Sequence, residues 1–317
     1  MSKANGIVVF GSTDVTVAVL EAVAVAAIPI VAVVSSGAEF RISYSPTVVR
    51  NARAVDVAGW CTARSVPCLT YDGYAPLTEF LSDQNPALGL AAGWYHMIPA
   101  RVRNLFAHGC LGFHASLLPR LRGGAPLNWA LLNGDMECGM TLFEMTDGVD
   151  DGAIYAQRRT SIGDRTMVGE LVDWSQATCA EMAVSELPSI IQGRARPVQQ
   201  EGVATYGLQR APEDGEIVWT RPAAEIDRLI RAVTRPYPGA FTHLGADKVT
   251  IWKSQPLASP VVCGKPGQLF RLPGTETIAV VTGSGLIAIE DATGPDGANF
   301  LATLAKASQR RFTGPAS

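Results

Sequence analysis

The sequence predicts an α/β protein in which a Rossmann-like, mostly parallel sheet is followed by a smaller β-rich domain. In the first two-thirds of the chain, short apolar runs without alternation are separated by stretches of helical spacing. Such runs are typical of parallel strands that are buried on both faces. From residue 205 onward, short strand-like runs lie between Gly and Pro turns. We therefore expect an α/β domain over residues 1–200 and an OB-like, β-rich domain over residues 205–317.

Composition excludes several classes of protein. The chain has 317 residues, of which 47% are hydrophobic, so it is not a disordered chain. The net charge of −3 gives no basic field for nucleic acid. The six cysteines form no C-x-x-C pair and there are only four histidines, so we expect no metal site. Unpaired cysteines without a signal-peptide pattern favour a cytoplasmic protein.

One apolar stretch, Val15 to Val34, is about as long as a membrane span. Glu21 lies inside this stretch and Pro29 breaks it. A buried helix over Thr13–Ala26, followed by a buried strand, explains the pattern better, and we expect no membrane partner.

The other elements follow from the same patterns. Strands of the first domain are expected at Ile7–Phe10, Ile30–Val34, Val66–Leu69, Leu88–Ala92 and Cys110–His114. Further helices are expected over Val48–Ser65, Leu77–Leu81 and Thr166–Gln192, with Gly193–Gly202 as a polar linker. In the second domain we expect a helix over Arg221–Val233 and strands at Val249–Trp252, Ile278–Val281 and Leu286–Glu290.

A histidine closes the last of these parallel strands. His114 lies in the run LGFHASLLPRLRGGAP, Leu111 to Pro126, where a compact turn and a glycine pair follow it. Ligands of parallel sheets bind outside the carboxyl ends of the strands, and imidazole is the commonest general acid–base group. A structural role for this histidine remains open from spacing alone.

A second stretch, Thr141 to Ile154, contains a strand followed by an acidic loop. The loop holds Asp147, Asp150 and Asp151 between glycines. Asp and Gly favour turns, so a solvated turn would explain the pattern. A carboxylate directed at the histidine, which would orient the imidazole, would explain it as well.

Four runs together resemble the folate-dependent formyltransferases. They are FHASLLPRLRGGAPLNWALLNG (Phe113–Gly134), MTDGVDDGAIYAQ (Met145–Gln157), GWYHMIP (Gly93–Pro99) and, in the second domain, RAVTRPYPGAFTHLGADKVTIW (Arg231–Trp252). That family includes methionyl-tRNA, glycinamide ribonucleotide and amino-sugar N-formyltransferases. The resemblance implies an enzyme that moves the formyl group of 10-formyltetrahydrofolate, its co-substrate, to a primary amine.

The resemblance also implies roles for individual residues. His114 matches the family's catalytic histidine, a proton shuttle, and Asp150 matches the aspartate that supports it. The residues expected around the folate are His96, Met97, Ile98, Leu117, Leu118, Pro119, Gly124, Thr146, Asp147, Gly148 and Val149. The cofactor supplies the organic chemistry, and the protein supplies orientation and electrostatics.

One position departs from the family pattern. Gly112 stands where the family has an asparagine whose amide donates to the formyl oxygen. Losing such a donor typically costs about 10²–10³ in rate. A protonated His114, a water in the space that glycine leaves, or a donor from the region of Asn128 could replace it. Alternatively, the chain is a folate-pocket binding protein with reduced turnover.

The amine acceptor is inferred from charge. Residues 201–317 hold 12 Lys or Arg against 11 Asp or Glu, and residues 1–200 hold 14 against 18. The loop Gly37–Pro46 contains one arginine, Arg41, together with Glu39, Phe40 and Tyr44. Because phosphate contacts need excess cations, we expect a small-molecule amine, namely a nucleotide-linked amino sugar or an amino acid such as ornithine. Methionyl-tRNA is the alternative acceptor, and a homodimer through the second domain remains open.

Overall fold

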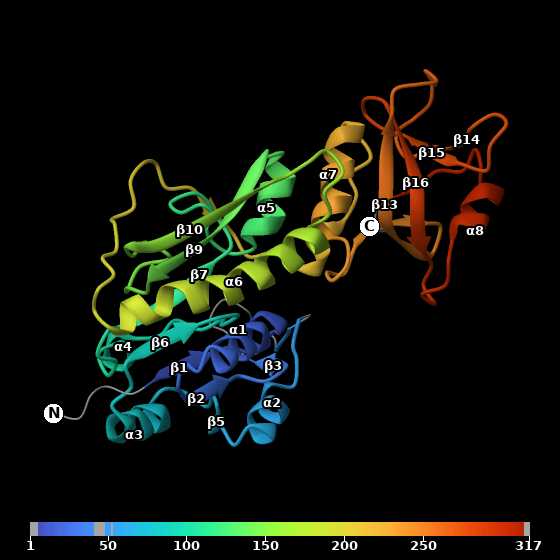
Figure 1. Cartoon of the computed structure of the whole chain (residues 1–317). Coiled ribbons are helices and arrows are strands. Elements are labelled where there is room, and N and C mark those ends of the chain that lie inside the picture. Colours follow the sequence, from blue (N-terminus) through green and yellow to red (C-terminus); the bar gives the residue numbers. More distant parts are fainter. Residues whose placement is uncertain (1–5, 41–47, 52, 314–317) are drawn as a thin grey trace. The chain divides into compact units, whose positions relative to one another are not determined.

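The computed structural model describes residues 6–40, 48–51 and 53–313 (Figure 1). The chain divides into two compact units, which are described separately below. Unit 1 comprises Met1–Pro126, Glu137–Ser161 and Val172–Leu208, and unit 2 comprises Leu127–Met136, Ile162–Leu171 and Gln209–Ser317. Two segments that the sequence placed in the first domain, 127–136 and 162–171, therefore group with unit 2.

Unit 1 is built on a seven-stranded sheet with the strand order β10-β9-β7-β6-β1-β2-β5. Its strands are β1 (Ile7–Phe10), β2 (Ile30–Ser35), β5 (Cys68–Thr70), β6 (Leu88–Ala91), β7 (Cys110–His114), β9 (Glu137–Glu144) and β10 (Ile154–Ser161). The five strands from β7 to β5 are parallel, whereas β9 is antiparallel to both of its neighbours. The predicted mostly parallel α/β class is confirmed.

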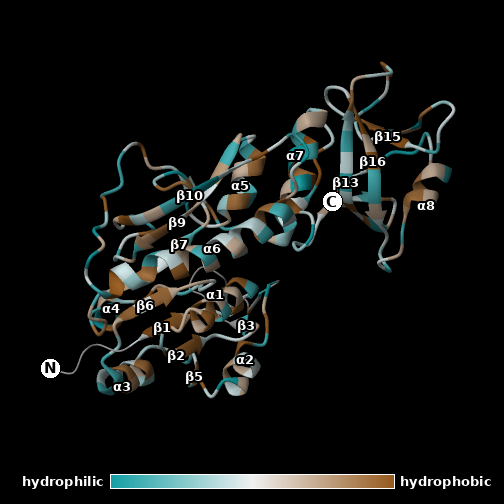
Figure 2. Ribbon diagram, in the orientation of Figure 1, coloured by the Kyte–Doolittle hydropathy of each residue, from teal (hydrophilic) through white to brown (hydrophobic). Residues whose placement is uncertain are grey.

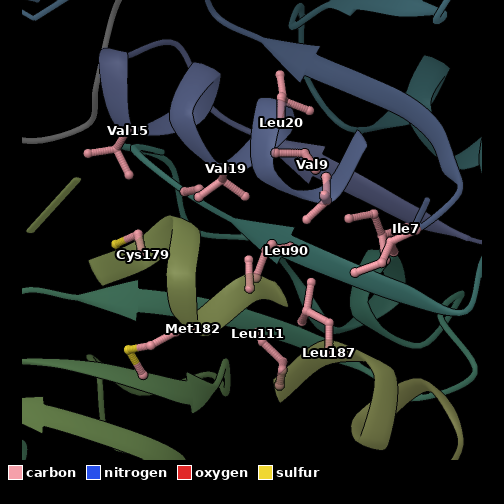
Figure 3. Close-up of a cluster of buried hydrophobic side chains, with 14 of the residues drawn as sticks. Ile7, Val9, Val15, Val19, Leu20, Leu90, Leu111, Cys179, Met182 and Leu187 are labelled. Carbon is pink, nitrogen blue, oxygen red and sulfur yellow. The ribbon is translucent and has the colours of Figure 1, made fainter. Parts of the chain in front are cut away.

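Helices cover both faces of this sheet. One face packs against α1 (Asp14–Val25), α2 (Val57–Ala63) and α6 (Val168–Ile191), and the other against α3 (Ala75–Gln84) and α4 (Ala100–Arg103). Figure 3 shows the first contact, where Val19 and Leu20 of α1 and Met182 of α6 meet strand residues such as Leu90 and Leu111. The central strands are accordingly hydrophobic along their length (Figure 2). Burial on both faces explains why these strands show no alternation in the sequence.

The strand order places the carboxyl ends of β1, β6 and β7 side by side. β1 lies between β2 and β6: the next strand along the chain, β2, lies on one side of β1, and the later strand β6 lies on the other. The strand order therefore reverses at β1. In sheets of this kind, ligands bind at such a switch point. His114 ends β7, and residues 93–98 follow β6 at the same edge.

Unit 2 contains a five-stranded antiparallel sheet with the order β12-β13-β16-β15-β14, which confirms a β-rich second domain. Its strands are β12 (Ala240–Leu244), β13 (Asp247–Leu257), β14 (Leu269–Arg271), β15 (Ile278–Val281) and β16 (Leu286–Thr293). Its helices are α5 (Pro126–Asn133), which starts one residue before the unit, the 3-10 helix η1 (Pro212–Gly215), α7 (Ala223–Val233) and α8 (Leu301–Lys306). The sequence predicted β13, β15, β16 and α7 but not β12, β14 or α8.

One predicted helix is much shorter than expected. The pattern over Val48–Ser65 predicts a single helix, but α2 begins only at Val57. Asp56 caps it by accepting a hydrogen bond from the backbone N–H of Gly59 at 2.8 Å. The preceding residues form β4 (Val49–Arg50), which pairs with β3 (Glu39–Phe40). Arg41 and Tyr44 of the loop before β4 lie outside the described residues.

Among the described residues, no helix is long and apolar enough to cross a membrane. The apolar stretch from Val15 to Val34 is divided between α1 and β2. The same part of the chain holds no cluster of three or more His, Cys, Asp or Glu side chains that could bind a metal ion.

Candidate active site

His114 is held at the carboxyl end of β7, with 7% of its surface exposed. Its Nε2 lies 2.6 Å from the carbonyl oxygen of Leu121. Because a carbonyl oxygen only accepts hydrogen bonds, Nε2 carries a proton in this arrangement. Nδ1 is therefore the nitrogen that can gain or lose one.

Asp150 faces this second nitrogen. Its Oδ2 lies 3.4 Å from Nδ1 of His114. The carboxylate can therefore accept a hydrogen bond from Nδ1 when that nitrogen carries a proton. At 3.4 Å the contact is longer than a charge-assisted hydrogen bond, which leaves the Nδ1 proton accessible to a third partner.

The acidic loop separates two neighbouring aspartates. Asp150 has a positive φ of 50°, and its Oδ2 accepts a hydrogen bond from the backbone N–H of Gly123 at 2.7 Å. Asp151 is exposed and instead accepts a hydrogen bond from the hydroxyl of Thr146 within its own loop. The structure therefore brings Asp150, and not Asp151, to the histidine.

The two segments expected to hold the folate are joined by one arginine. Arg103 of α4 donates to the carbonyl oxygen of Ile98 at 2.6 Å and forms a 2.7 Å ion pair with Asp147. Ile98 is 1% exposed, whereas Met97 is 54% and Val149 is 49% exposed. The two segments thus lie together and present apolar side chains to solvent at their ends.

His96, within the first of these segments, belongs to an aromatic cluster. Its ring centroid lies 4.5 Å from that of Tyr71 and 5.0 Å from that of Trp94. Burial lowers the pKa of His96 below its usual value of 6.5.

The run Leu117 to Pro119 forms a rigid turn after the histidine. Thr141 donates its hydroxyl to the carbonyl oxygen of Ser116 at 2.7 Å, and the Gln157 amide donates to that of Leu118 at 2.9 Å. The N–H of Gly124 is bound to the carbonyl oxygen of Gly207 at 2.7 Å. The turn is thus fixed through its backbone, with Leu118 buried beneath it.

The position of Gly112 is enclosed by side chains. A Cβ atom there would lie 3.2 Å from Cε1 of Phe143 and 3.4 Å from Cγ of Met145. The ring of Phe143 also lies edge-on to His114, with the centroids 6.4 Å apart. Apolar side chains therefore border the space beside Gly112, and one of them, Phe143, also contacts the histidine.

Asn128 lies in the region named above as a possible source of a replacement donor. Its amide is buried and donates to the carbonyl oxygen of Ala232 at 2.6 Å within unit 2. This hydrogen bond uses one of the two N–H groups of the amide.

Two residues at this site were missed, because Gln200 lies in the predicted linker Gly193–Gly202 and Thr205 lies at the predicted start of the second domain. The side-chain amide of Gln200 donates to the carbonyl oxygens of Asp150 and Gly152, both at 2.8 Å. Thr205 accepts a hydrogen bond from the N–H of Leu121 at 2.8 Å. Glutamine and threonine in a polar segment carry no signal of such a role.

Comparisons with known proteins agree with this geometry. The family model described as formyl transferase matches residues 3–183, and that of the formyl transferase C-terminal domain matches residues 210–303. The first match covers more than half of the chain. This chain belongs to the formyl transferase family.

Relatives of the formyltransferase are known in both sequence and structure. A methionyl-tRNA formyltransferase of Pelotomaculum thermopropionicum is 33% identical over 217 residues, which are 68% of this chain and 69% of that protein. The N-formyltransferase of Helicobacter canadensis, solved with folinic acid and dTDP-3-aminofucose, has a TM-score of 0.68 at 16% identity and covers 90% of this chain and 99% of its own. HypX of Aquifex aeolicus, solved with tetrahydrofolic acid, has a TM-score of 0.60 at 17% identity and covers 96% and 48%. The two structural likenesses concern the fold alone.

The formyltransferase site therefore combines a buried imidazole, a carboxylate and two joined loops at one edge of the sheet. Such a pair can move protons, and the loops offer backbone groups beside exposed apolar side chains. Formyl transfer is the activity of the family, and the chain is a formyl-transferring enzyme.

Proposed function

We propose that this enzyme transfers the formyl group of 10-formyltetrahydrofolate to the primary amine of a small molecule. The observation that carries the proposal is the contact between His114 and Asp150 at the carboxyl edge of the sheet, 3.4 Å between Nδ1 and Oδ2. It lies beside the loops that Arg103 joins through Ile98 and Asp147. The family of the chain and a neighbour solved with folinic acid support the choice of donor.

In the proposed reaction, the amine nitrogen attacks the formyl carbon and a tetrahedral oxyanion forms. The attacking nitrogen then loses a proton and N10 of the folate gains one, so that the bond between the formyl carbon and N10 breaks. His114 carries this proton through Nδ1, while Leu121 fixes Nε2. Asp150 faces Nδ1, and in this proposal the ring in its protonated form stabilises the oxyanion in place of an asparagine amide.

The folate is proposed to lie along the two joined loops. Residues His96, Met97 and Ile98 form one side, and Thr146 to Val149 form the other. The fixed turn Leu117–Pro119 closes the wall behind it, and Gly124 allows close approach. The pterin ring of tetrahydrofolate has several hydrogen-bonding groups along its edges, so backbone groups between apolar side chains suit it.

The charge of the chain favours a small acceptor over a nucleic acid. The net charge is −3, and the cations of unit 1 with the most buried side chains are paired, as Arg53 with Asp14 and Arg103 with Asp147. In unit 2, Asp227 binds both Arg165 and Arg231. Cations that are neutralised within the fold contribute little to phosphate binding. A nucleotide-linked amino sugar, as bound by the Helicobacter canadensis neighbour, and the side-chain amine of ornithine are the proposed acceptor classes.

Methionyl-tRNA is the second candidate acceptor, because a methionyl-tRNA formyltransferase is 33% identical to this chain. The two candidates differ in their dependence on salt. Binding of tRNA through phosphates would weaken by orders of magnitude between 50 and 200 mM salt, whereas binding of a small amine would change little.

The test is an assay of the purified enzyme with 10-formyltetrahydrofolate and each acceptor class. We expect tetrahydrofolate release with an amino sugar nucleotide or ornithine, and none with methionyl-tRNA. Turnover with methionyl-tRNA alone would overturn the proposed acceptor. Folate binding without turnover on any amine, under conditions in which a known relative is active, would favour a binding protein instead.

A further inference from the structure

The segment 198–207, which follows α6, contacts both sides of the proposed proton-transfer pair. We propose that Gln200 is a positioning residue that holds Asp150 against His114, and that Thr205 does the same for Leu121. This inference rests on the proposed function of the site. Neither residue is expected to touch the substrate: Gln200 acts through Asp150, and Thr205 acts through Leu121 on His114.

Gln200 holds the backbone of the acidic loop at Asp150 and Gly152. Its single amide group donates to the carbonyl oxygens of Asp150 and Gly152, both at 2.8 Å. Asp150 has the left-handed φ of 50°, a conformation that a non-glycine residue keeps only where its surroundings enforce it. By binding the carbonyl groups on both sides of Asp151, the amide holds the loop in the shape that directs Asp150 inward.

Gln200 is itself oriented by an arginine. Nε and Nη2 of Arg122 donate to its Oε1 at 3.1 and 2.7 Å, so both ends of the amide are engaged. The residue after Arg122 is Gly123, whose N–H donates to Oδ2 of Asp150 at 2.7 Å. The backbone and the carboxylate of Asp150 are therefore held from the same short stretch of chain.

Thr205 supports the other partner of the pair. Its hydroxyl accepts from the N–H of Leu121 at 2.8 Å, and its carbonyl accepts from the N–H of Arg122 at 2.8 Å. Leu121 has a positive φ of 54°, and its carbonyl oxygen is the group that lies 2.6 Å from Nε2 of His114. Fixing Leu121 thus fixes the rotation of the imidazole.

The segment has other anchors, so changes at these two side chains should leave it in place. Val198 exchanges two backbone hydrogen bonds with Ile154, at 2.7 and 2.8 Å. β11 (Tyr206–Gly207) pairs in parallel with β8 (Arg122–Gly123). A purely structural role would therefore be shared with the backbone, whereas the orientation of the pair depends on the side chains.

The decisive variants are nearly isosteric. Gln200→Glu replaces the donating amide with an oxygen that faces two carbonyl oxygens, yet it still binds Arg122. Thr205→Val removes the hydroxyl, and Thr205→Ser restores it. Gln199→Glu is the matched control, because Gln199 is the exposed neighbour and undergoes the same change of charge.

We expect Gln200→Glu and Thr205→Val to lower kcat by about 10–100-fold, since small misplacements of reacting groups can cost 10² in rate. The KM for the folate should stay within about threefold, and Thr205→Ser and Gln199→Glu should behave like wild type. Unchanged kcat in both variants, or a rise in KM alone, would overturn the proposal. If urea denaturation shows that Gln200→Glu is less stable than wild type, Gln200→Asn is the variant to measure, because its shorter amide cannot reach both carbonyl oxygens. Wild-type turnover in Gln200→Asn would contradict positioning by Gln200.

A spectroscopic measurement separates this inference from the proposed function. The imidazole N–H of His114 bound to Leu121 should give a protected proton resonance in NMR, assigned by its loss in His114→Gln. It should persist in Thr205→Ser and Gln199→Glu and broaden or disappear in Thr205→Val. This measurement needs no amine acceptor, so an enzyme that is inactive on every amine would contradict only the proposed reaction. An unchanged resonance in Thr205→Val would contradict positioning by Thr205.

Discussion

The acidic loop 145–152 and the polar segment 198–207 meet at the same histidine but contribute different things. The loop supplies a charged group, Asp150, whose residue type signals its chemistry. The segment supplies uncharged hydrogen bonds from Gln200 and Thr205, which determine where the charged group lies. The difference shows that the chemistry of a site can be inferred from residue types, whereas its geometry depends on residues with no chemical signature.

The largest effect should come from the charged group itself. Asp150→Asn keeps the size of the side chain but removes the carboxylate charge that faces Nδ1 of His114, so kcat should fall by about 10²–10⁴-fold with little change in folate affinity. Asp151→Asn, the matched change one position along, should stay within about threefold, because Asp151 binds Thr146 within its own loop. Steady-state kinetics of both variants test this prediction. An inactive Asp151→Asn beside an active Asp150→Asn would show that the roles are reversed.

The next largest effect is expected at Gly112, beside the histidine. Gly112→Asn introduces a Cβ 3.2 Å from the ring of Phe143, so we expect a loss of about 1–3 kcal/mol in the free energy of unfolding and no gain in kcat. Phe143→Leu removes the edge of that ring. In the double variant, Gly112→Asn should therefore lower the free energy of unfolding less than it does in wild type, and it should raise kcat above that of Phe143→Leu alone. Urea denaturation and kinetics of the four proteins measure this coupling. Strict additivity would mean that Phe143 does not exclude the amide.

Arg103 tests whether the two folate loops must be joined. Arg103→Met keeps the apolar stem but loses the hydrogen bond to Ile98 and the ion pair with Asp147, so the KM for the folate should rise about tenfold, ~1.4 kcal/mol, at a nearly constant kcat. Asp147→Asn should have a much smaller effect, because the Asp147 side chain is 83% exposed and exposed ion pairs contribute little. Arg101→Met, an exposed change in the same helix, is the control. Equal effects of Arg103→Met and Asp147→Asn would contradict this ranking.

Much of the fold could be predicted from local pattern, and the errors have physical causes. β7 ends at His114 as expected, because an apolar run followed by a polar residue indicates both a buried strand and the point where it ends. The pattern over Val48–Ser65 predicted too long a helix, because the helix begins only after Asp56, which caps it by accepting a hydrogen bond from the N–H of Gly59. The sequence also gives no sign that Phe143 of β9 would pair with Gly112 of β7 and pack beside it. Contacts that arise from sheet pairing are not encoded in either strand alone.

The smallest predicted effect concerns His96, which lies in one of the two loops proposed to hold the folate. Burial lowers its pKa from 6.5, so below pH 6.5 the unfolded chain takes up a proton before the folded protein does. The free energy of unfolding should therefore fall as the pH drops from 6.5 towards the lowered pKa, and the contribution of His96 should level off below it. His96→Phe keeps a ring against Tyr71 and Trp94 but does not titrate, so its stability should depend less steeply on pH in this range than that of wild type. Urea denaturation at pH 7.5, 6.0 and 5.0 measures the two slopes, with Met97→Leu, which retains the histidine, as the control. Parallel slopes in wild type and His96→Phe would show that the ring of His96 takes up its proton as readily in the folded protein as in the unfolded chain.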